Sequence, residues 1–565
     1  MPEDIKRLPA SELPALAEKV RERILDVVSG NGGHLAASLG TVELTIALLR
    51  TFDPPTDKIL WDVGHQSYAW KILTGRNDKF GSLRCHHGIS GFPNPTESSC
   101  DAFVAGHAGS ALAAAAGLAA ARDRLGGGHV VAVVGDASLT NGESLEALNV
   151  CTLLTDKMIV VVNDNAMPPL KNVGALEALG LRCLGPVDGH DLNAMISALT
   201  VAKEDSRSVV VHVVTKKGKG FPPAETDPSA WHCVGPFNLK NAEGRSAQPF
   251  GTEMMSRTWS DTFGTAMVAA AKKDDRVCAV VAAMKDGTGL SAFAEAFPDR
   301  FFDVGICEEL AVTFAAGLAK AGMKPVVAIY STFLQRAIDQ IQHDVCLQRL
   351  PVVFAIDRAG CVGADGATHH GLYDISLFRP LSGLRIVAPT CAEELETLLD
   401  EALAADGPTA IRYPKGTAPA WRDVADGGLH SLSLTPPAKN EVPRALGDEP
   451  QVTLCAVGDQ VAKAIKVKEI LAEKGIGAEV VPVRRVKPAL VCADTTFEKS
   501  NHVGRLLVTL ENGVVIGGFG ESVRADLTFG WPDTVVGHGT VAELEREFGF
   551  DADTIAAAIV RRIGR

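Results

Sequence analysis

Two short segments place oxygen-bearing side chains directly after apolar runs. Asp136 lies in GDASLTNG (Gly135–Gly142), immediately after HVVAVV, and Asn165 lies in NDNAM (Asn163–Met167), immediately after KMIVVV. If both runs are parallel strands, their carboxyl ends bring a carboxylate and an amide oxygen to the same edge of a sheet. Hard oxygen ligands of this kind suit Mg²⁺, which takes few protein ligands and accepts others from a diphosphate.

A second interpretation explains the same two segments equally well. Gly, Asp and Asn are common at strand ends simply because they favour turns. The glycine turn would let backbone N–H groups approach a diphosphate, but the pair of segments alone leaves both interpretations open.

The wider pattern resembles the thiamine diphosphate signature, in which Gly-Asp-Gly is followed about thirty residues later by Asn, as Gly135 is followed by Asn165 here. Longer segments narrow the resemblance to the 1-deoxy-D-xylulose 5-phosphate synthases, a family within the transketolase superfamily. Those in the first part of the chain are GGHLAASLGTVEL (Gly32–Leu44), WDVGHQSYAWKILTGR (Trp61–Arg76), GISGF (Gly88–Phe92), GHAGSA (Gly106–Ala111), GPVDGH (Gly185–His190) and TKKGKG (Thr215–Gly220). Those further along are FDVGICEELAVTFAAG (Phe302–Gly317), AIYSTFLQRAIDQIQHD (Ala328–Asp344), DRAGCVGADGATHHG (Asp357–Gly371) and IRYPKG (Ile411–Gly416).

The resemblance implies a reaction and its cofactors. Pyruvate would be joined to D-glyceraldehyde 3-phosphate with loss of CO₂, giving 1-deoxy-D-xylulose 5-phosphate. Thiamine diphosphate with Mg²⁺ would take up the electrons released by decarboxylation, so the protein would supply orientation and charge. The product would be the first of the non-mevalonate isoprenoid route and would also feed thiamine and pyridoxal cofactor synthesis. A homodimer is implied as well.

Glu308 begins a helical, Ala-rich segment. A Glu in a first helical turn is commonly there because the helix dipole favours it. The resemblance implies instead that Glu308 is the carboxylate that shares a proton with the aminopyrimidine ring and so activates the thiazolium C2. A carboxylate in that place has to be buried, and we expect its pKa to be raised. Phe333 and Arg336 resemble pyrimidine-pocket residues, although a buried Phe is otherwise most simply core.

Four histidines, His34, His65, His232 and His369, lie at motif positions among small residues. A lone His is more often structural, but His is the side chain best suited to move protons near neutral pH. The resemblance places His65 near the cofactor and the other three where they could relay protons to substrate oxygens. Asp365 would orient or charge-balance the site of His369.

The resemblance also implies the full set of cofactor and metal contacts. The cofactor contacts are His65, Gly106, His107, Ala108, Asp136, Ala137, Ser138, Asn165, Phe221, Glu308, Phe333 and Arg336, and the metal ligands are Asp136, Asn165 and Met167.

Recognition of the substrate phosphate calls for positive charge. Arg358 follows PVVFAID and Arg412 follows GPTAI, so both are expected at strand ends, where Arg can bind phosphate bidentately. Surface salt bridges are the ordinary role of an isolated Arg. The resemblance matches both residues to phosphate-binding arginines and Tyr330 to a substrate-pocket residue, but Lys415 stands where RYPRG is expected, which weakens the match at Arg412.

Three features depart from the family. Ala137 replaces the second Gly of Gly-Asp-Gly, and Phe221 stands where Tyr is frequent. After Met167 the family has a long excursion, whereas PPLKNVGALEALGLRCLGPVDGH closes the gap directly here. Loop-closure entropy changes slowly with length, so a shorter connection is compatible with the fold. It is either a natural short form or an engineered one.

The elements that must position these residues are short, continuous apolar runs, as expected of strands buried on both faces. Helical periodicity lies between them, for example over Asp459–Lys474 and Ala392–Ala404, so the sequence predicts α/β domains with doubly wound, mostly parallel sheets of the transketolase type. The expected strands are His129–Gly135, Lys157–Asn163, Ser208–Val214, Val277–Ala283, Pro325–Tyr330, Pro351–Asp357, Leu384–Pro389, Thr409–Tyr413, Val452–Gly458, Glu479–Val483 and Arg505–Glu511.

Two polar stretches rich in Gly and Pro, Asn238–Gly251 and Gly416–Pro450, read as linkers. They predict three domains: a diphosphate-side domain at 1–245, a pyrimidine-side domain at 252–420, and a C-terminal transketolase-like domain at 445–565.

Composition excludes several classes of function. The 565 residues include 55 Lys+Arg and 68 Asp+Glu, a net charge of −13, without a long basic cluster, which argues against nucleic-acid and anionic-membrane partners. The start of the chain is charged and lacks the apolar region of a secretory signal. Twelve Cys without a CxxC pair suggest reduced thiols in a cytoplasmic protein.

Three alternatives remain beside the synthase. A transketolase or a 2-oxoacid dehydrogenase component would share cofactor and fold, although STFLQRAIDQ and GADGATHHG favour the synthase. A non-catalytic thiamine diphosphate-binding protein is the second, given Ala137 and the short connection. A dinucleotide-binding domain is the weakest, because no GxGxxG follows an expected strand.

Overall fold

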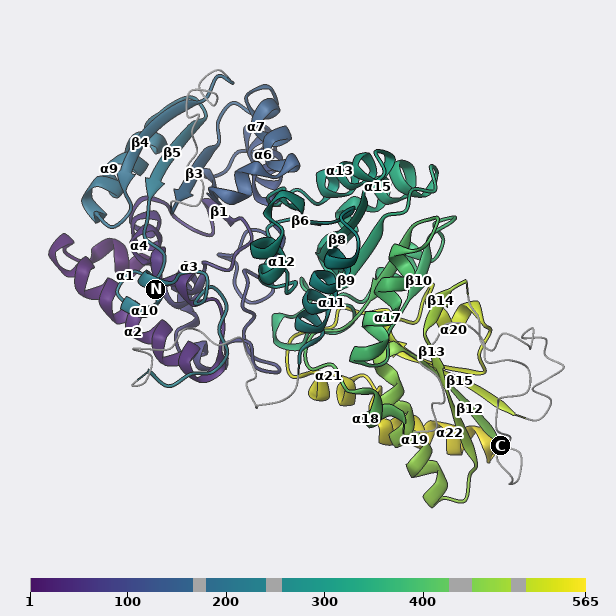
Figure 1. Cartoon of the computed structure of the whole chain (residues 1–565). Helices are drawn as coiled ribbons and strands as arrows, with labels where there is room; N and C mark the ends of the chain where they lie inside the picture. The colour runs from purple at the N-terminus through teal and green to yellow at the C-terminus, as the bar shows by residue number, and fades with distance from the viewer. Residues whose placement is uncertain (1, 166–178, 240–256, 426–449, 489–504, 565) are drawn as a thin grey trace. The chain divides into compact units, whose positions relative to one another are not determined.

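In the computed structural model the chain forms two compact units, Met1–Glu253 with Ala364–Thr368, and Met254–Gly363 with His369–Arg565 (Figure 1). The residues that the structure describes are 2–165, 179–239, 257–425, 450–488 and 505–564.

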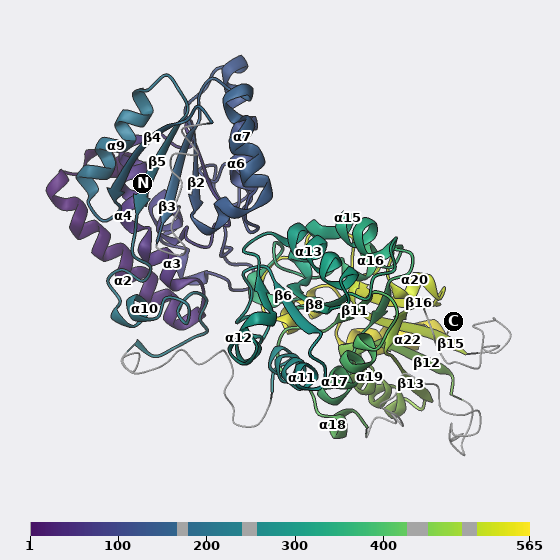
Figure 2. The ribbon, with the colours of Figure 1, turned by 45° about the horizontal axis from the view of Figure 1, so that its top comes forward.

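The first unit is built on a five-stranded sheet in the order β1-β2-β3-β5-β4, with every pair parallel. Its Val-rich strands are buried on both faces because α2, α4 and α9 cover one side and α6 and α7 the other (Figure 2). The bounds are β1 Lys58–Trp61, β2 Val130–Gly135, β3 Ile159–Asp164, β4 Arg182–Asp188, β5 Val209–Val214, α2 Leu13–Asn31, α4 Val42–Thr51, α6 Ser110–Leu125, α7 Gly142–Leu154 and α9 Leu192–Glu204.

The second unit contains two sheets. The larger has the order β14-β10-β11-β9-β8-β6-β7 and is parallel except for the pair of β10 with β14. Helices α11 and α17 pack on one face and α13 on the other. The bounds are β6 Val277–Val281, β7 Phe301–Asp303, β8 Lys324–Tyr330, β9 Val353–Asp357, β10 Arg385–Val387, β11 Thr409–Arg412, β14 Arg485–Lys487, α11 Trp259–Lys273, α13 Glu308–Lys320 and α17 Ala392–Leu403.

The smaller sheet has the parallel order β13-β12-β15-β16, and α19 and α22 pack against it. Strand β14 follows β13 in the chain but pairs with β10, so it joins the smaller sheet to the larger one. The bounds are β12 Val452–Val457, β13 Ala478–Val483, β15 Leu506–Val514, β16 Leu527–Trp531, α19 Val461–Glu473 and α22 Ala552–Ile563.

Shorter helices connect these elements. They are α1 Pro2–Arg7, α3 Leu35–Gly40, α5 Tyr68–Lys71, α10 Pro222–Thr226, α12 Ser291–Ala296, α14 Ser331–Leu334, α15 Ile338–Gln340, α16 Asp374–Phe378, α18 Trp421–Ala425, α20 Phe519–Ser522 and α21 Val541–Glu547.

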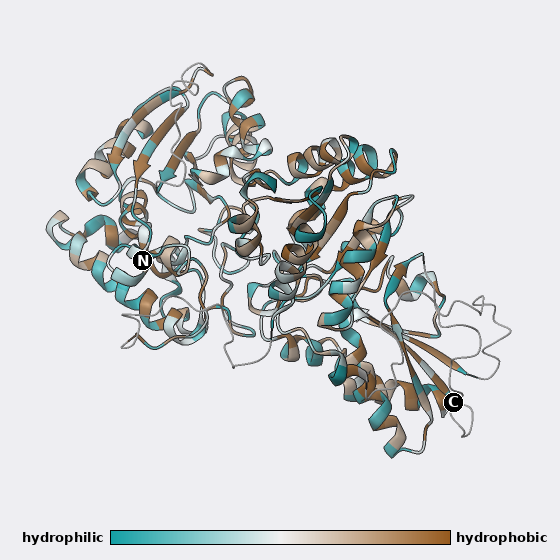
Figure 3. Ribbon diagram, viewed as in Figure 1, coloured by the Kyte–Doolittle hydropathy of each residue, from teal (hydrophilic) through white to brown (hydrophobic). Residues whose placement is uncertain are grey.

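The predicted fold class is confirmed. Each of the eleven apolar runs overlaps a strand, and the strands are the hydrophobic layers of the sheets (Figure 3). The three-domain division stays a prediction. No helix among the described residues is both long and apolar enough to cross a bilayer. The predicted linkers lie largely outside the described residues, as does most of the short connection after Met167.

Candidate active site

The predicted meeting of Asp136 and Asn165 occurs at the carboxyl edge of the first sheet. Strands β2 and β3 pair so that Gly135 lies opposite Asn163, and the N–H of Asp136 donates to the Asn163 carbonyl at 3.2 Å. The Asp136 carboxylate accepts hydrogen bonds from the backbone N–H groups of Ala137, at 2.8 Å, and of Asn165, at 3.4 Å. The register of the two strands therefore brings the two residues together.

The oxygens of Asp136 and Asn165 at this edge are of the kind that binds a divalent cation. The Asn165 Oδ1 is buried and accepts no hydrogen bond from the described residues, whereas the Asn163 Oδ1 already accepts one from Thr215. Burial raises the pKa of Asp136, opposed by its two N–H donors and by Lys217. Met167, the third predicted metal ligand, lies outside the described residues.

The segment GHAGSA is held by a residue that sequence reasoning missed. The Asp62 carboxylate, just after β1, accepts hydrogen bonds from the N–H groups of Gly109 and Ala111, both within 3.1 Å. Gly109 has a φ of +94°, and an added Cβ would lie 2.2 Å from the Asn141 Oδ1. These contacts fix the backbone where α6 begins.

The residues before Gly109 contact the segment Ala364–Thr368, which packs with the first unit. The His107 Nε2 lies 2.8 Å from the Thr368 carbonyl oxygen, and a Cβ on Gly106 would lie 2.4 Å from the Thr368 side chain. Ala108 and Ser138 are buried. The cofactor contacts predicted for Gly106, His107, Ala108, Ala137 and Ser138 stay predictions.

His34, His65 and His232 form a cluster in the first unit. Their ring centroids lie 5.8 Å apart for His34 with each of the other two and 5.0 Å apart for His65 with His232. Burial lowers the pKa of His34 well below its usual value, and Arg84 adds to the effect. Desolvation lowers the pKa of the His232 imidazole to about 4, with a contribution from Lys217. His34 and His232 are therefore neutral imidazoles at pH 7.

Asp365 forms an ion pair with Arg84 in the first unit, at 2.9 Å. Arg84 is buried and has a φ of +63°, so the pair holds a constrained backbone beside the histidine cluster. The role predicted for Asp365 at His369 stays a prediction. Phe221 packs on Trp231 at a centroid distance of 5.1 Å within the core, and its contact with the cofactor stays a prediction too.

In the second unit, Glu308 is the first residue of α13 and only 1% exposed. The nearest cation is Arg336, whose Nη1 lies 3.6 Å from the Glu308 Oε2, and that oxygen accepts no hydrogen bond from the described residues. Burial raises the pKa of Glu308 despite Arg336. The expected raised pKa is thus confirmed.

Phe333 and the end of β8 form an aromatic group. The Phe333 ring stacks on Tyr330 at 5.8 Å and meets His369 edge-on at 5.5 Å. The Arg358 guanidinium lies over the Tyr330 ring, 3.7 Å from its centroid. Three predicted residues, Tyr330, Arg358 and His369, are therefore brought together with Phe333.

Arg358 itself has a φ of +57° and follows Asp357, the last residue of β9. Asp357 is fully buried and accepts a hydrogen bond from the Ser260 hydroxyl at 2.7 Å. Burial raises the pKa of Asp357 to about 6, with Arg358 opposing.

Arg412, one of the two predicted phosphate-binding arginines, is buried and hydrogen-bonded to other parts of the protein. It is 3% exposed and donates to both oxygens of Asp374, at 2.9 and 3.3 Å, and to the Asn512 carbonyl at 2.8 Å. These contacts use Nε and Nη2. The geometry gives Arg412 a structural role, and its predicted phosphate contact stays a prediction.

His370, the neighbour of His369, has a structural role. It is 2% exposed, accepts a hydrogen bond from the Val362 N–H through Nδ1, and contacts the Gly537 carbonyl oxygen through Nε2. The THHG motif therefore contains one histidine of the aromatic group and one that anchors the loop.

Three family models match the chain. That described as 1-deoxy-D-xylulose-5-phosphate synthase matches residues 1–179 and 175–215, the transketolase pyrimidine binding domain matches 255–420, and the transketolase C-terminal domain matches 443–555. The first model is matched in two pieces that meet at 175–179, inside the connection that the sequence predicts to be short.

Curated relatives match over essentially the whole chain. The 1-deoxy-D-xylulose-5-phosphate synthase 1 of Geobacter sulfurreducens is 42% identical over 627 positions, covering 99% of this chain and 95% of the relative. The 1-deoxy-D-xylulose-5-phosphate synthase of Pelotomaculum thermopropionicum is 43% identical over 630 positions, covering 100% and 96%. Both alignments are longer than the 565 residues of this chain, so the relatives contain residues that it lacks.

Among solved structures, the transketolase of Campylobacter jejuni aligns over 98% of this chain and 100% of its own length, with 18% identity and a TM-score of 0.46.

Proposed function

Because the chain belongs to the 1-deoxy-D-xylulose-5-phosphate synthase family, we propose which of its residues carry out the family's reaction. The enzyme is a transketolase-type transferase that condenses pyruvate with D-glyceraldehyde 3-phosphate, releasing CO₂, to give 1-deoxy-D-xylulose 5-phosphate. The product is the first of the non-mevalonate isoprenoid route.

Thiamine diphosphate, when bound, supplies the electron sink for decarboxylation. Asp136 and Asn165 would hold Mg²⁺ on its diphosphate. The Oδ1 of Asn165, which is buried and accepts no hydrogen bond from the described residues, lies beside the buried Asp136 carboxylate and supports this assignment, because such an oxygen gives up no hydrogen bond from those residues when it binds a cation. Mg²⁺ would in turn neutralise the diphosphate charge.

The burial of the Glu308 carboxyl is the observation that best supports the proposal. Glu308 is 1% exposed, one of its oxygens accepts no hydrogen bond from the described residues, and burial raises its pKa, so this carboxyl binds a proton more readily than an exposed one does. We assign Glu308 the task of exchanging that proton with the aminopyrimidine ring. Arg336 opposes this rise of the Glu308 pKa.

The histidine cluster would handle protons on substrate oxygens. A neutral imidazole offers one N–H donor and one acceptor, and the Nδ1 of His34 makes no hydrogen bond with the described residues. His34 and His232 therefore suit the transfer or donation of a proton. We assign His65 to cofactor contact and His369 to the aldehyde substrate.

Arg358 would bind the phosphate of D-glyceraldehyde 3-phosphate. Tyr330 fixes the guanidinium plane by stacking, and a fixed guanidinium loses little freedom when it binds a phosphate bidentately. Arg412 would add a contact through its Nη1.

Two further parts of the proposal concern the whole protein. From the family resemblance we propose a homodimer and a cytoplasmic location. Size-exclusion chromatography with light scattering would measure the first, and a fluorescent fusion in the source cell would locate the second.

The proposed function is tested by substrate choice. The purified chain with thiamine diphosphate and Mg²⁺ should form 1-deoxy-D-xylulose 5-phosphate only when both pyruvate and D-glyceraldehyde 3-phosphate are present. Xylulose 5-phosphate with ribose 5-phosphate should give no product. Ketol transfer between those sugars would indicate a transketolase, and cofactor binding without any turnover would indicate a non-catalytic protein.

A further inference from the structure

The loop that begins with Arg358 is held at each successive N–H group. Four backbone donors of this loop have partners within 3.1 Å: Ala359 donates to the Tyr413 carbonyl, Gly360 to the Gly371 carbonyl, Cys361 to the Asn512 Oδ1, and Val362 to the His370 Nδ1. Of these four, only Cys361 is held by a residue of the smaller sheet. Asn512, on β15, is therefore where that sheet contacts the loop.

The side chain of Asn512 is buried, at 6% exposure, and both ends of its amide are used. The Oδ1 accepts from the Cys361 N–H at 3.0 Å and from the Trp531 Nε1 at 2.9 Å. The Nδ2 donates to the Asp459 Oδ2 at 2.9 Å. Because only the amide nitrogen can donate to a carboxylate, Asp459 fixes which end of the amide faces the loop.

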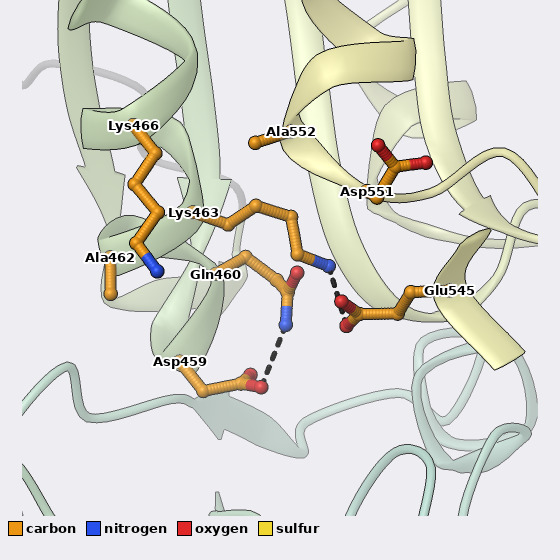
Figure 4. A pocket seen from close by; sticks show the side chains of 8 residues that line it. All are labelled: Asp459, Gln460, Ala462, Lys463, Lys466, Glu545, Asp551 and Ala552. Atoms are coloured by element: carbon orange, nitrogen blue, oxygen red, sulfur yellow. Dashed lines mark hydrogen bonds and ion pairs between the residues drawn. The ribbon is translucent and has the colours of Figure 1, made fainter. Parts of the chain in front are cut away.

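Asp459 is itself held in place. It follows β12 and accepts a hydrogen bond from the Gln460 Nε2 at 2.7 Å, at one end of the pocket in Figure 4. Gln460 is 4% exposed, so the donor of this hydrogen bond is buried. The orientation of Asn512 therefore rests on Asp459, which is half-buried, and on Gln460, which is buried.

Gly360 shows how closely the loop approaches Asn512. Its φ is +85°, and an added Cβ would lie 2.2 Å from the Asn512 amide. Gly360 also exchanges both backbone hydrogen bonds with Gly371, at 2.7 and 2.8 Å. Gly360 comes two residues after Arg358, and Gly371 comes two residues after His369. The two hydrogen bonds between these glycines therefore hold the backbone near Arg358 against the backbone near His369.

We propose that Asn512 is a positioning residue for the phosphate-binding end of the active site. It fixes the Gly360–Cys361 backbone and thereby the direction in which Arg358 leaves β9. Arg412 supports the same residue, because its Nη2 donates to the Asn512 carbonyl. The smaller sheet, which contributes no predicted catalytic residue, thus shapes recognition of the acceptor substrate. This inference rests on the proposed role of Arg358.

The proposal is tested by exchanging the amide of Asn512 and the carboxylate of Asp459. Asn512→Asp places two carboxylates face to face, and we expect it to raise the KM for D-glyceraldehyde 3-phosphate by about tenfold, the effect of losing one buried hydrogen bond. The KM for pyruvate and the Kd of thiamine diphosphate should change by less than about twofold.

The double variant Asn512→Asp/Asp459→Asn restores the pairing with its polarity reversed. The introduced amide at position 459 can donate to the introduced carboxylate at position 512. After a flip of its own amide, Gln460 can accept from that same introduced amide. The KM for D-glyceraldehyde 3-phosphate should therefore return to within about threefold of wild type.

Two further variants separate positioning from stability. Val508→Ala removes buried volume from the same strand, and a Val side chain makes no hydrogen bond to the loop, so this variant should lower the Tm and leave both KM values unchanged. Gly360→Ala disturbs the same contact from the loop and should likewise raise the KM for D-glyceraldehyde 3-phosphate but not that for pyruvate. This variant keeps the proposal testable if Asn512→Asp does not fold. An independent readout is the Cys361 thiol, 5% exposed, whose alkylation mapped by mass spectrometry should quicken in Asn512→Asp and not in Val508→Ala.

An equal rise of both KM values, no rise in either, or a double variant that fails to recover would overturn the proposal. Failure of the proposed function is distinguishable from this result. If the wild-type chain forms no product, the proposed function is wrong. If Arg358→Ala leaves the KM for D-glyceraldehyde 3-phosphate unchanged, the assignment of Arg358 to the phosphate is wrong. In both cases the alkylation rate of Cys361 still reports whether Asn512 holds the loop.

Discussion

Asp136 and Asn165 meet because each follows a strand by one residue, so their separation depends on strand register rather than on a preformed loop. Asp136→Ala removes the charged acceptor of the pair. We expect the affinity for thiamine diphosphate with Mg²⁺ to fall by about 100-fold, equivalent to about 2.7 kcal/mol, within the range for hydrogen bonds and ion contacts to charged groups. Isothermal titration calorimetry measures this directly.

Asp164→Asn is the matched control at the same sheet edge. Asp164 is similarly buried but its carboxylate contacts His212, at 2.9 Å. The control should retain wild-type affinity. Wild-type affinity in Asp136→Ala as well would remove the metal assignment.

The two arginines proposed to bind phosphate, Arg358 and Arg412, have different surroundings, so replacing them should affect stability differently. Arg358→Ala removes a charged donor stacked on Tyr330 and should raise the KM for D-glyceraldehyde 3-phosphate by about 10- to 100-fold with little change for pyruvate. Arg412→Ala leaves the buried Asp374 carboxylate without its partner, so it should also lower the Tm, which Arg358→Ala should not. Steady-state kinetics and thermal melts separate the two. An equal effect of Arg358→Ala on both substrates would show that Arg358 is structural.

At the scale of elements, the ends of parallel strands concentrate titratable groups in places that folding desolvates. Asp357 closes β9, is fully buried, and has its pKa raised by that burial to about 6. An acid whose folded pKa exceeds its unfolded value of about 4 favours folding most when it is protonated. Its contribution is therefore lost as the pH rises from about 4 to about 6, at a cost of up to about 3 kcal/mol.

Asp357→Asn removes this titration while keeping an acceptor for Ser260. The Tm of the variant relative to wild type should consequently rise between pH 4 and pH 6 and then level off. Other groups titrate in both proteins and cancel in the difference. A Tm difference that stays constant from pH 4 to pH 7 would show that Asp357 is not the desolvated acid that its burial implies.

Most of the strands that the sequence predicted are continuous Val, Ile and Ala runs buried on both faces, although β13 is only half-buried. The strands that it missed are all edge strands: β1, β4, β7, β14 and β16. Strand β1 is buried but has only four residues. Strand β4 contains Gly185 and Pro186 and is half-exposed, β7 and β14 have three residues each, and β16 is interrupted by Gly530. Edge strands take their structure from a neighbour, and hydrophobic periodicity does not record that neighbour.

The same distinction applies to the whole molecule. Residues inside long motifs, such as Glu308, His34 and Arg358, could be proposed for the site because the family resemblance assigns roles to their positions. The contact of Asp62 with the beginning of α6, the Arg84–Asp365 ion pair and the contact of Asn512 with Cys361 could not be predicted, because each joins segments between 47 and 281 residues apart. Such pairings arise from tertiary packing, and a single sequence offers no local pattern for them.

Activation of the cofactor by Glu308 is the central claim, since it precedes either substrate and depends on a carboxyl group that folding has buried. The most direct test is the rate of hydrogen–deuterium exchange at C2 of bound thiamine diphosphate in wild type and in Glu308→Gln. Gln keeps the size and much of the hydrogen-bonding capacity but cannot share the proton, so exchange should slow by at least about 100-fold while cofactor affinity falls much less. Exchange at the wild-type rate in Glu308→Gln would contradict the claim and leave Glu308 as a residue that merely begins α13.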